Sequence, residues 1–380
     1  MKIKKVFIIS LLSCFFITPV AVNGSQINNL SITAESAYLC DYNSGEVIFA
    51  KNENIRKPIA SMTKIMTLLL AFERYENNSL LLTDKVLISD YASSMGGSQV
   101  FLQAKKEYIV EDLLKSIVVA SANDASVAIS EYLFGSEENA VVAMNQKAKD
   151  LGLMNTLFSN TTGLTRPTQY SSAKDVATMF RELLKHEIYY KFSSIYLDEI
   201  IHPDGKTTQL TNTNKLIKSY TGCDGGKTGF TNEAGYCVAA TAKRGAMRIV
   251  GVIINEPDSK TRFADCSKLF NYAFENYDCK QILADNLPTE YNVEIKKGKK
   301  QYCEVYSEKP IYIFSAKNKK DEIKFEFVPL GEVIAPIKEG QQVGDLIVYL
   351  NGVKYCTTKA VVREKIDRKS LYDIMEEIVL

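Results

Sequence analysis

The stretch PIASMTK, residues 58–64, runs directly into the apolar stretch IMTLLLAF, residues 65–72. A proline just before a continuous apolar run marks the start of a helix. Because this run is apolar nearly all round, the helix is predicted to be deeply buried. Ser61 and Lys64 are three residues apart and therefore project from the same face, so the Lys64 amine can reach the Ser61 hydroxyl.

Ser61 and Lys64 are residue types that can serve as a nucleophile and its base. A serine hydroxyl needs a base to become nucleophilic. The chain has two histidines, His186 and His202; neither lies in a recognisable elbow, and no G-x-S-x-G is present. A histidine triad is therefore poorly supported, which leaves Lys64 as the candidate base. Its pKa must then be lowered by burial or by a nearby cation. The S-x-x-K tetrad alone is weak support, because it often occurs by chance.

Two further motifs make the pattern specific. Ser121-Ala122-Asn123 follows an apolar helical stretch, and Lys227-Thr228-Gly229 opens a strand-like stretch. S-x-x-K, S-x-N and K-T-G in this order resemble the penicillin-binding proteins and class A β-lactamases. The segments PIASMTKIMT, SANDAS, MNQKAKDLGLMNT, DGGKTGFT and AGYCVAATAKR are similar to the low-molecular-weight penicillin-binding proteins, the serine D-alanyl-D-alanine carboxypeptidases. This resemblance covers roughly residues 30–280, and the tail resembles their C-terminal domain.

The resemblance implies a role for each motif residue. Ser61 would be the acylated nucleophile and Lys64 its general base. Ser121 would relay a proton to the leaving D-alanine nitrogen, and Asn123 would bind a substrate amide and touch Lys64. The substrate would be the peptidoglycan stem peptide, and β-lactams would be covalent inhibitors.

The K-T-G strand is implied to complete the site. Lys227 would shape the field at Ser121, and Thr228, beside Gly229, would contact the terminal carboxylate. Backbone N–H groups of Ser61 and Phe230 would form the oxyanion hole, because donors must point to where negative charge develops.

An arginine is expected to recognise the free carboxylate through its planar fork. Arg262 stands where the family has such an arginine. Arg244 and Arg248 are competitors, interpreted here as turn and strand surface charges. The stretch 160–166 resembles the family's lid-like loop, but it has threonine where many members have histidine or aspartate.

Three alternatives share these motifs. A class A β-lactamase would need a glutamate in E-x-x-L-N to activate the deacylating water, and the nearest candidate, Glu182-Leu183-Leu184-Lys185, lacks the asparagine. An endopeptidase acting on D-Ala cross-links could use the same site. A member that has lost activity could sense wall fragments.

The implied fold is a mixed α/β (α+β) catalytic domain, with an antiparallel sheet flanked by helices and an all-helical lobe, followed by a small all-β domain. Alternating residues predict a hairpin over 36–49. Helices are predicted over 110–119, 125–133, 138–151, 173–185 and 261–277, and strands over 227–230, 236–242 and 247–255. The expected divisions are a signal peptide over 1–24, a catalytic domain over 25–283, a β-rich domain over 284–366 and an amphipathic helix over 367–380.

Composition restricts the partners. Lys plus Arg is 46 and Asp plus Glu is 45, so net charge gives no support for a nucleic-acid partner.

The basic start and short apolar run of the chain indicate a secretory signal, and hence export to the outer face of the membrane or the wall. The cysteines are scattered, with no ligand spacing, so neither a zinc site nor a disulfide framework is supported, and most are expected to be free thiols. No metal or cofactor is expected. The C-terminal helix is a candidate for peripheral membrane contact.

Overall fold

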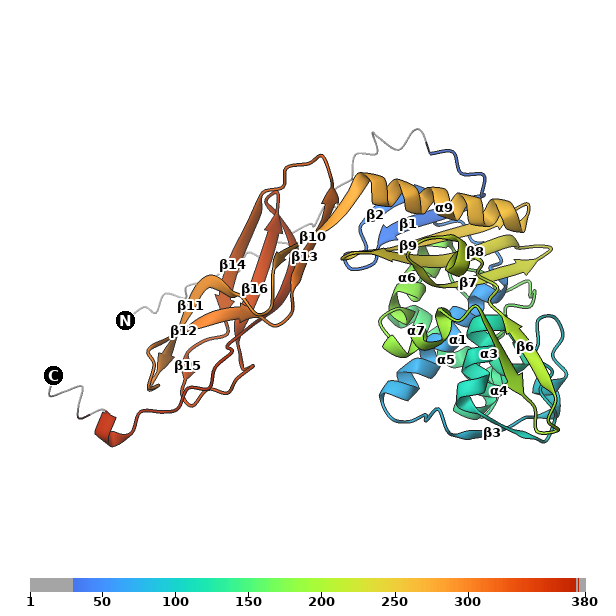
Figure 1. The fold of residues 1–380 in the computed structure, drawn as a ribbon, viewed down its shortest axis with the longest axis horizontal. Coiled ribbons are helices and arrows are strands. Elements are labelled where there is room, and N and C mark those ends of the chain that lie inside the picture. Colours follow the sequence, from blue (N-terminus) through green and yellow to red (C-terminus); the bar gives the residue numbers. More distant parts are fainter. Residues whose placement is uncertain (1–29, 374, 376–380) are drawn as a thin grey trace, which may run out of the picture. The chain divides into compact units, whose positions relative to one another are not determined.

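The central sheet of the catalytic domain is built from strands that are distant in sequence. The computed structural model describes residues 30–373 and 375 (Figure 1). The antiparallel strands are β1 (Ser36–Asp41), β2 (Val47–Lys51), β7 (Cys223–Thr231), β8 (Gly235–Arg244) and β9 (Met247–Glu256), in the order β2-β1-β9-β8-β7. Strand β9 is buried along nearly its whole length, which matches its continuous apolar sequence. The predicted hairpin over 36–49 is confirmed by β1 and β2.

Helices cover both faces of this sheet. They are α1 (Lys64–Glu76), α2 (Asp90–Ser93), α3 (Val110–Ala120), α4 (Asn123–Phe134), α5 (Glu137–Asp150), α6 (Ala173–Leu183), α7 (Glu187–Ser193), α8 (Leu216–Ser219) and α9 (Ser259–Asn276). Helix α9 packs on one face of the sheet, and α6 packs on the opposite face together with the helical lobe (Figure 1). Two short hairpins, β3 (Lys85–Leu87) with β4 (Glu107–Ile109) and β5 (Leu197–Ile201) with β6 (Thr207–Thr211), lie in this domain.

The helix that follows the S-x-x-K tetrad is buried as predicted. A 3₁₀ turn over Ala60–Thr63 precedes α1, so Ser61 lies in the turn and Lys64 is the first residue of the helix. From Lys64 to Phe72, only Leu70 is not buried. The nucleophile candidate is thus held in a turn that leads directly into a deeply buried helix.

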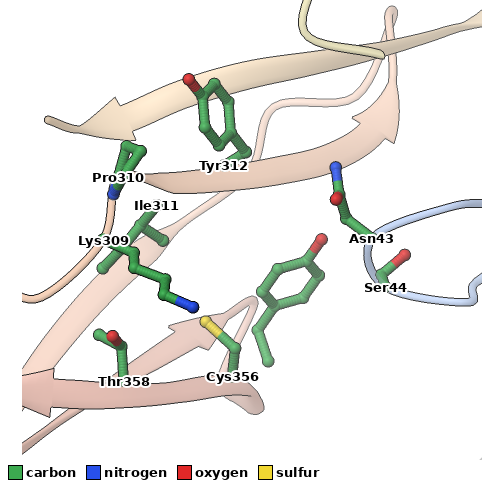
Figure 2. Close-up of a pocket in the computed structure, with 9 residues that line it drawn as sticks. Asn43, Ser44, Lys309, Pro310, Ile311, Tyr312, Cys356 and Thr358 are labelled. Carbon is green, nitrogen blue, oxygen red and sulfur yellow. The ribbon is translucent and has the colours of Figure 1, made fainter. Parts of the chain in front are cut away.

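The β-rich part contains β10 (Tyr277–Leu283), β11 (Pro288–Lys296), β12 (Tyr302–Ser307), β13 (Ile311–Ala316), β14 (Ile323–Pro329), β15 (Val333–Ile334), β16 (Gln342–Leu350) and β17 (Val353–Val361). One sheet has the order β14-β16-β17-β12-β11-β15, and β10 pairs with β13. Asn351 and Gly352 both have positive φ between β16 and β17, which confirms the predicted Asn-Gly hairpin. Figure 2 shows Ile311 and Tyr312 at the start of β13 and Cys356 and Thr358 on β17. Tyr355, also on β17, accepts a hydrogen bond from the Phe314 N–H of β13 at 3.0 Å.

The two ends of the chain bear differently on the sequence predictions. The expected signal peptide over 1–24 lies outside the described residues. Of the predicted apolar face of the C-terminal helix, Leu371 and Met375 are described, and they are 82% and 66% exposed. Among the described residues, no helix is both long and apolar enough to cross a membrane.

The described cysteines form no disulfide, and all are buried except Cys356, which is half-buried. The expectation of free thiols is therefore confirmed.

Two buried carboxyl groups lie where β9 meets α9. Glu256 and Asp265 are 1% and 0% exposed, and Asp265 also accepts the Thr33 N–H at 2.5 Å. Burial and, after it, the neighbouring Asp265 carboxyl together raise the pKa of Glu256 to about 7. Since the folded pKa lies above the unfolded one, stability from this group is complete below about pH 4.5 and is lost as pH rises to about 7.

We therefore expect Glu256→Gln, which imitates the protonated acid, to remove this pH dependence. At pH 8 the variant should have a free energy of unfolding about 1–3 kcal/mol above wild type, and the two should converge near pH 4.5. Urea unfolding at both pH values measures this. A variant that is less stable than wild type at pH 8 would contradict the prediction.

Candidate active site

The Lys64 amine is the centre of the candidate site. Its Nζ lies 2.9 Å from the Ser61 Oγ, 2.6 Å from the Asn123 Oδ1 and 2.6 Å from the Thr162 carbonyl oxygen. Lys64 is fully buried, whereas Ser61 is half-buried and remains reachable. The structure thus brings together the S-x-x-K serine and lysine with the asparagine of S-x-N.

The surroundings of Lys64 favour its neutral form. Burial lowers the pKa of Lys64 well below its ordinary value, and the Lys227 cation lowers it further, while Asp124 opposes both. Within the described part of the chain Lys64 forms no ion pair; its partners are a hydroxyl, an amide oxygen and a carbonyl. A buried amine without a paired carboxylate gives up its proton more readily.

A second lysine–serine pair faces the first. Lys227 donates from Nζ to the Ser121 Oγ at 2.6 Å and to the Thr228 carbonyl at 3.0 Å. Burial and, after it, the Arg262 cation together lower the pKa of Lys227 to about 7. Ser121 ends α3 with a φ of 62°, and this left-handed residue lies between α3 and α4, so it is set by the junction of two helices.

Close backbone approach explains two glycines. A Cβ on Gly229 would lie 2.6 Å from the Ile59 carbonyl oxygen and 3.1 Å from the Ser61 nitrogen. A Cβ on Gly163 would lie 2.8 Å from the same nitrogen, and the φ of Gly163 is +87°. The K-T-G strand and the loop containing Gly163 therefore both pass next to the Ser61 N–H. Phe230, the next residue on β7, is 50% exposed and its ring lies 4.3 Å from that of Tyr236.

Arg262 lies behind the K-T-G strand. Its Nη1 donates to the carbonyls of Gly229 and Cys237 at 3.3 and 3.2 Å, and its Nη2 donates to the Ser259 Oγ at 3.1 Å. Burial lowers the pKa of Arg262 to about 10. Its positive charge is thus fixed against β7 and β8 by neutral acceptors.

The two competing arginines lie elsewhere. Arg244 is exposed and stacks over the Tyr220 and Phe274 rings. Arg248 was interpreted as a surface charge, and this was wrong: it is 9% exposed and makes a two-pronged contact with Asp224, each at 2.7 Å. The Asp224 carboxylate comes from β7, which is separated from β9 by β8, and it is what permits a buried arginine there.

Sequence reasoning missed the backbone partners of the site. The third partner of the Lys64 amine is the carbonyl of Thr162, and the Asn123 Nδ2 donates to the carbonyl of Gly96 at 2.7 Å. A main-chain carbonyl leaves no side-chain signal in a sequence. The glycine in the loop over 160–166 was the one available hint. The β-lactamase candidate Glu182 is engaged by Lys185 at 2.7 Å.

An antiparallel sheet flanked by helices, with a serine beside a buried lysine and a second lysine–serine pair facing it, defines a serine hydrolase of the penicillin-binding class. The sequence pattern of the family described as "D-alanyl-D-alanine carboxypeptidase" matches residues 23–258. That of "Penicillin-binding protein 5, C-terminal domain" matches residues 277–368. The chain belongs to the D-alanyl-D-alanine carboxypeptidase family and is a serine-type hydrolase of that family.

Individual relatives agree with this assignment. The D-alanyl-D-alanine carboxypeptidase DacF of Bacillus subtilis is 43% identical, covering 87% of this chain and 85% of the relative. DacA of Escherichia coli is 31% identical, over 84% and 80%. The crystal structure of penicillin binding protein 5 from Haemophilus influenzae superposes with a TM-score of 0.71 at 29% identity, covering 89% of this chain and 98% of that one. The predicted family, its fold and the all-β C-terminal domain are thereby confirmed.

Proposed function

We propose that this carboxypeptidase removes the terminal D-alanine from peptidoglycan stem peptides through an ester formed on Ser61. The observation that carries this proposal is the set of atoms around Lys64. A neutral amine has two N–H donors and one lone pair. The Asn123 Oδ1 and the Thr162 carbonyl, both acceptors, take the two donors. The lone pair is then left for the proton of the Ser61 hydroxyl, whose Oγ lies 2.9 Å from the Lys64 Nζ. This is the arrangement that a general base needs.

The acylation step follows from this arrangement. Ser61 Oγ attacks the carbonyl carbon of the penultimate D-alanine while its proton passes to Lys64. The peptide C–N bond then breaks, and the leaving D-alanine nitrogen takes a proton from Ser121, whose hydroxyl is polarised by Lys227 at 2.6 Å. Ser121 takes up in turn the proton held by the Lys64 ammonium, so that it relays one proton and Lys64 is neutral again. Water later hydrolyses the ester and releases the shortened peptide.

Charge that develops on the substrate has matching donors. The Ser61 and Phe230 N–H groups would bind the oxyanion, and the close approach of Gly229 supports this by letting β7 pass next to Ser61. The terminal carboxylate would be bound by Thr228, in the field of Arg262 behind the strand. Because the Arg262 guanidinium donates to the Gly229 carbonyl, we assign to it both a charge and the placement of that strand.

Asn123 would orient the substrate as well as the base. One of its two Nδ2 hydrogens is used by the Gly96 carbonyl, and the other is available for an amide carbonyl of the substrate. The anchored amide group also keeps the Oδ1 directed at Lys64. The deacylating glutamate of a class A β-lactamase has no counterpart in Glu182, which pairs with Lys185, so β-lactams should remain attached to Ser61.

We also propose that the chain is exported and acts at the outer face of the membrane or in the wall. The support is the basic and apolar start of the sequence, residues 1–24, and a substrate found outside the cytoplasm. The domain limits 25–283 and 284–366 are part of this proposal, as is membrane contact through the C-terminal helix, whose described Leu371 and Met375 are exposed.

Mass spectrometry of a wall pentapeptide incubated with the protein tests the reaction. We expect the loss of one alanine, followed by no further shortening, because the site recognises a C-terminal D-Ala-D-Ala. A cross-linked dimer offered in parallel reports endopeptidase action. A pentapeptide that stays intact with protein that binds penicillin at Ser61 would refute the proposed activity.

A further inference from the structure

The loop that supplies the Thr162 carbonyl to Lys64 is held in place from outside the site. The Thr161 carbonyl accepts hydrogen bonds from the Thr67 Oγ1 at 3.0 Å and from the Ser126 Oγ at 2.8 Å. Thr67 follows Lys64 by three residues on α1, and Ser126 follows Asn123 by three residues on α4. The two helices that carry the base and its asparagine therefore also hydrogen-bond the peptide unit next to Thr162.

Glu137 accepts hydrogen bonds from the other polar groups of the same loop residue, Thr161. Its Oε1 accepts from both the Thr161 N–H and the Thr161 Oγ1, at 2.9 and 2.8 Å. Its Oε2 accepts from the Tyr91 hydroxyl at 2.7 Å, and this hydrogen bond raises the pKa of Tyr91 to about 12. Glu137 is 8% exposed and Thr161 is fully buried.

These contacts leave Thr161 no hydrogen-bonding group that is free to move. Its N–H and hydroxyl end on Glu137, and its carbonyl ends on α1 and α4. The next carbonyl along the chain, that of Thr162, is the one that accepts from Lys64 at 2.6 Å. A shift of Thr161 would therefore be transmitted directly to one of the two acceptors that orient the amine.

We propose that Glu137 is a positioning residue for acylation, which sets the Thr162 carbonyl and through it the direction of the Lys64 lone pair. This rests on the proposed role of Lys64 as base. Glu137 does not contact Ser61 or Lys64. It acts because its side chain is long enough to hydrogen-bond Thr161, and not through its charge. Misplacing a reacting group by about 1 Å can cost on the order of 100-fold in rate.

Two substitutions separate reach from charge. Glu137→Asp keeps a carboxylate in the first turn of α5, where it favours the helix, but is one methylene too short to span Thr161 and Tyr91. Glu137→Gln keeps the length and one oxygen acceptor for Thr161, but loses the charge. We expect the acylation rate constant with a fluorescent penicillin to fall at least about 10-fold in Glu137→Asp and to stay within about threefold of wild type in Glu137→Gln.

The readout is the first-order rate of ester formation at saturating penicillin, which counts only molecules that label and is therefore independent of the folded fraction. The dissociation constant of the non-covalent complex should stay within about twofold, because no substrate contact is removed. Glu138→Gln, on the exposed neighbour in the same helical turn, serves as the control and should match wild type.

Each outcome has a distinct meaning. Wild-type acylation in Glu137→Asp would overturn the proposal, and so would an equal loss in Glu137→Gln, because charge would then be the property that matters. A loss carried by the dissociation constant alone would also overturn it. Labelling that persists in Ser61→Ala would instead refute the proposed function itself.

Discussion

Ser61→Ala should lose covalent penicillin labelling and D-alanine release completely. The Oγ is the atom proposed to form the ester, and Lys64 at 2.9 Å is its proton acceptor; without the oxygen no acyl-enzyme can form. The substitution removes one atom from a half-buried residue, so the fold should persist. Gel fluorescence after incubation with fluorescent penicillin, together with mass spectrometry of the pentapeptide, measures both losses.

Ser219→Ala is the matched control for this loss. Ser219 is exposed on α8 and donates to the Lys215 carbonyl of its own turn, so its removal should leave labelling at the wild-type level. A thermal unfolding curve close to wild type for Ser61→Ala would establish that the loss is chemical. Labelling that survives in folded Ser61→Ala would show that another residue is the nucleophile.

Lys64→Arg should lower the acylation rate by about 10²- to 10⁴-fold. Arginine keeps the positive charge, but it does not give up its proton near neutral pH and so cannot act as the base. In wild type, burial and the Lys227 cation lower the pKa of Lys64. Acylation should therefore rise with pH as the amine loses its proton, at pH values below the ordinary lysine range.

Stopped-flow measurement of acylation across pH tests this prediction, and Lys174→Arg is its control. Lys174 is exposed on α6, so the same exchange there should not change the rate. The larger guanidinium at the buried position 64 could disturb packing, and near-ultraviolet circular dichroism monitors this. A folded Lys64→Arg that acylates near the wild-type rate would show that Lys64 is not the general base.

Local patterns predicted much of the secondary structure. The helix predicted over 138–151 is α5, at Glu137–Asp150, and the one predicted over 261–277 is α9, at Ser259–Asn276. The start of α9 is earlier than predicted because Asp258 caps it, accepting from the Lys260 and Thr261 N–H groups. Capping and periodicity are properties of neighbouring residues, so a single sequence records them.

Buried charge was harder to predict. Arg248 was interpreted as a surface residue because an isolated arginine on a strand is most often exposed. Asp224, which neutralises it, is 24 residues away on another strand. Glu256 and Asp265 likewise meet only because α9 packs against β9. The partner that makes burial of a charge tolerable is set by packing, which a local pattern does not contain.

The sequence by itself determined the nucleophile candidate, its lysine and the family. Ser61 and Lys64 share a face through helical spacing alone, and the three motifs are specific in combination. Only the tertiary structure decided how the lysine is made into a base. Separate segments surround that amine with the Thr162 carbonyl, the Asn123 amide and the Lys227 cation. Glu137, from a further segment, holds Thr161 next to that carbonyl. Hydrogen bonds and burial depend on distance in space, and folding alone makes those distances short.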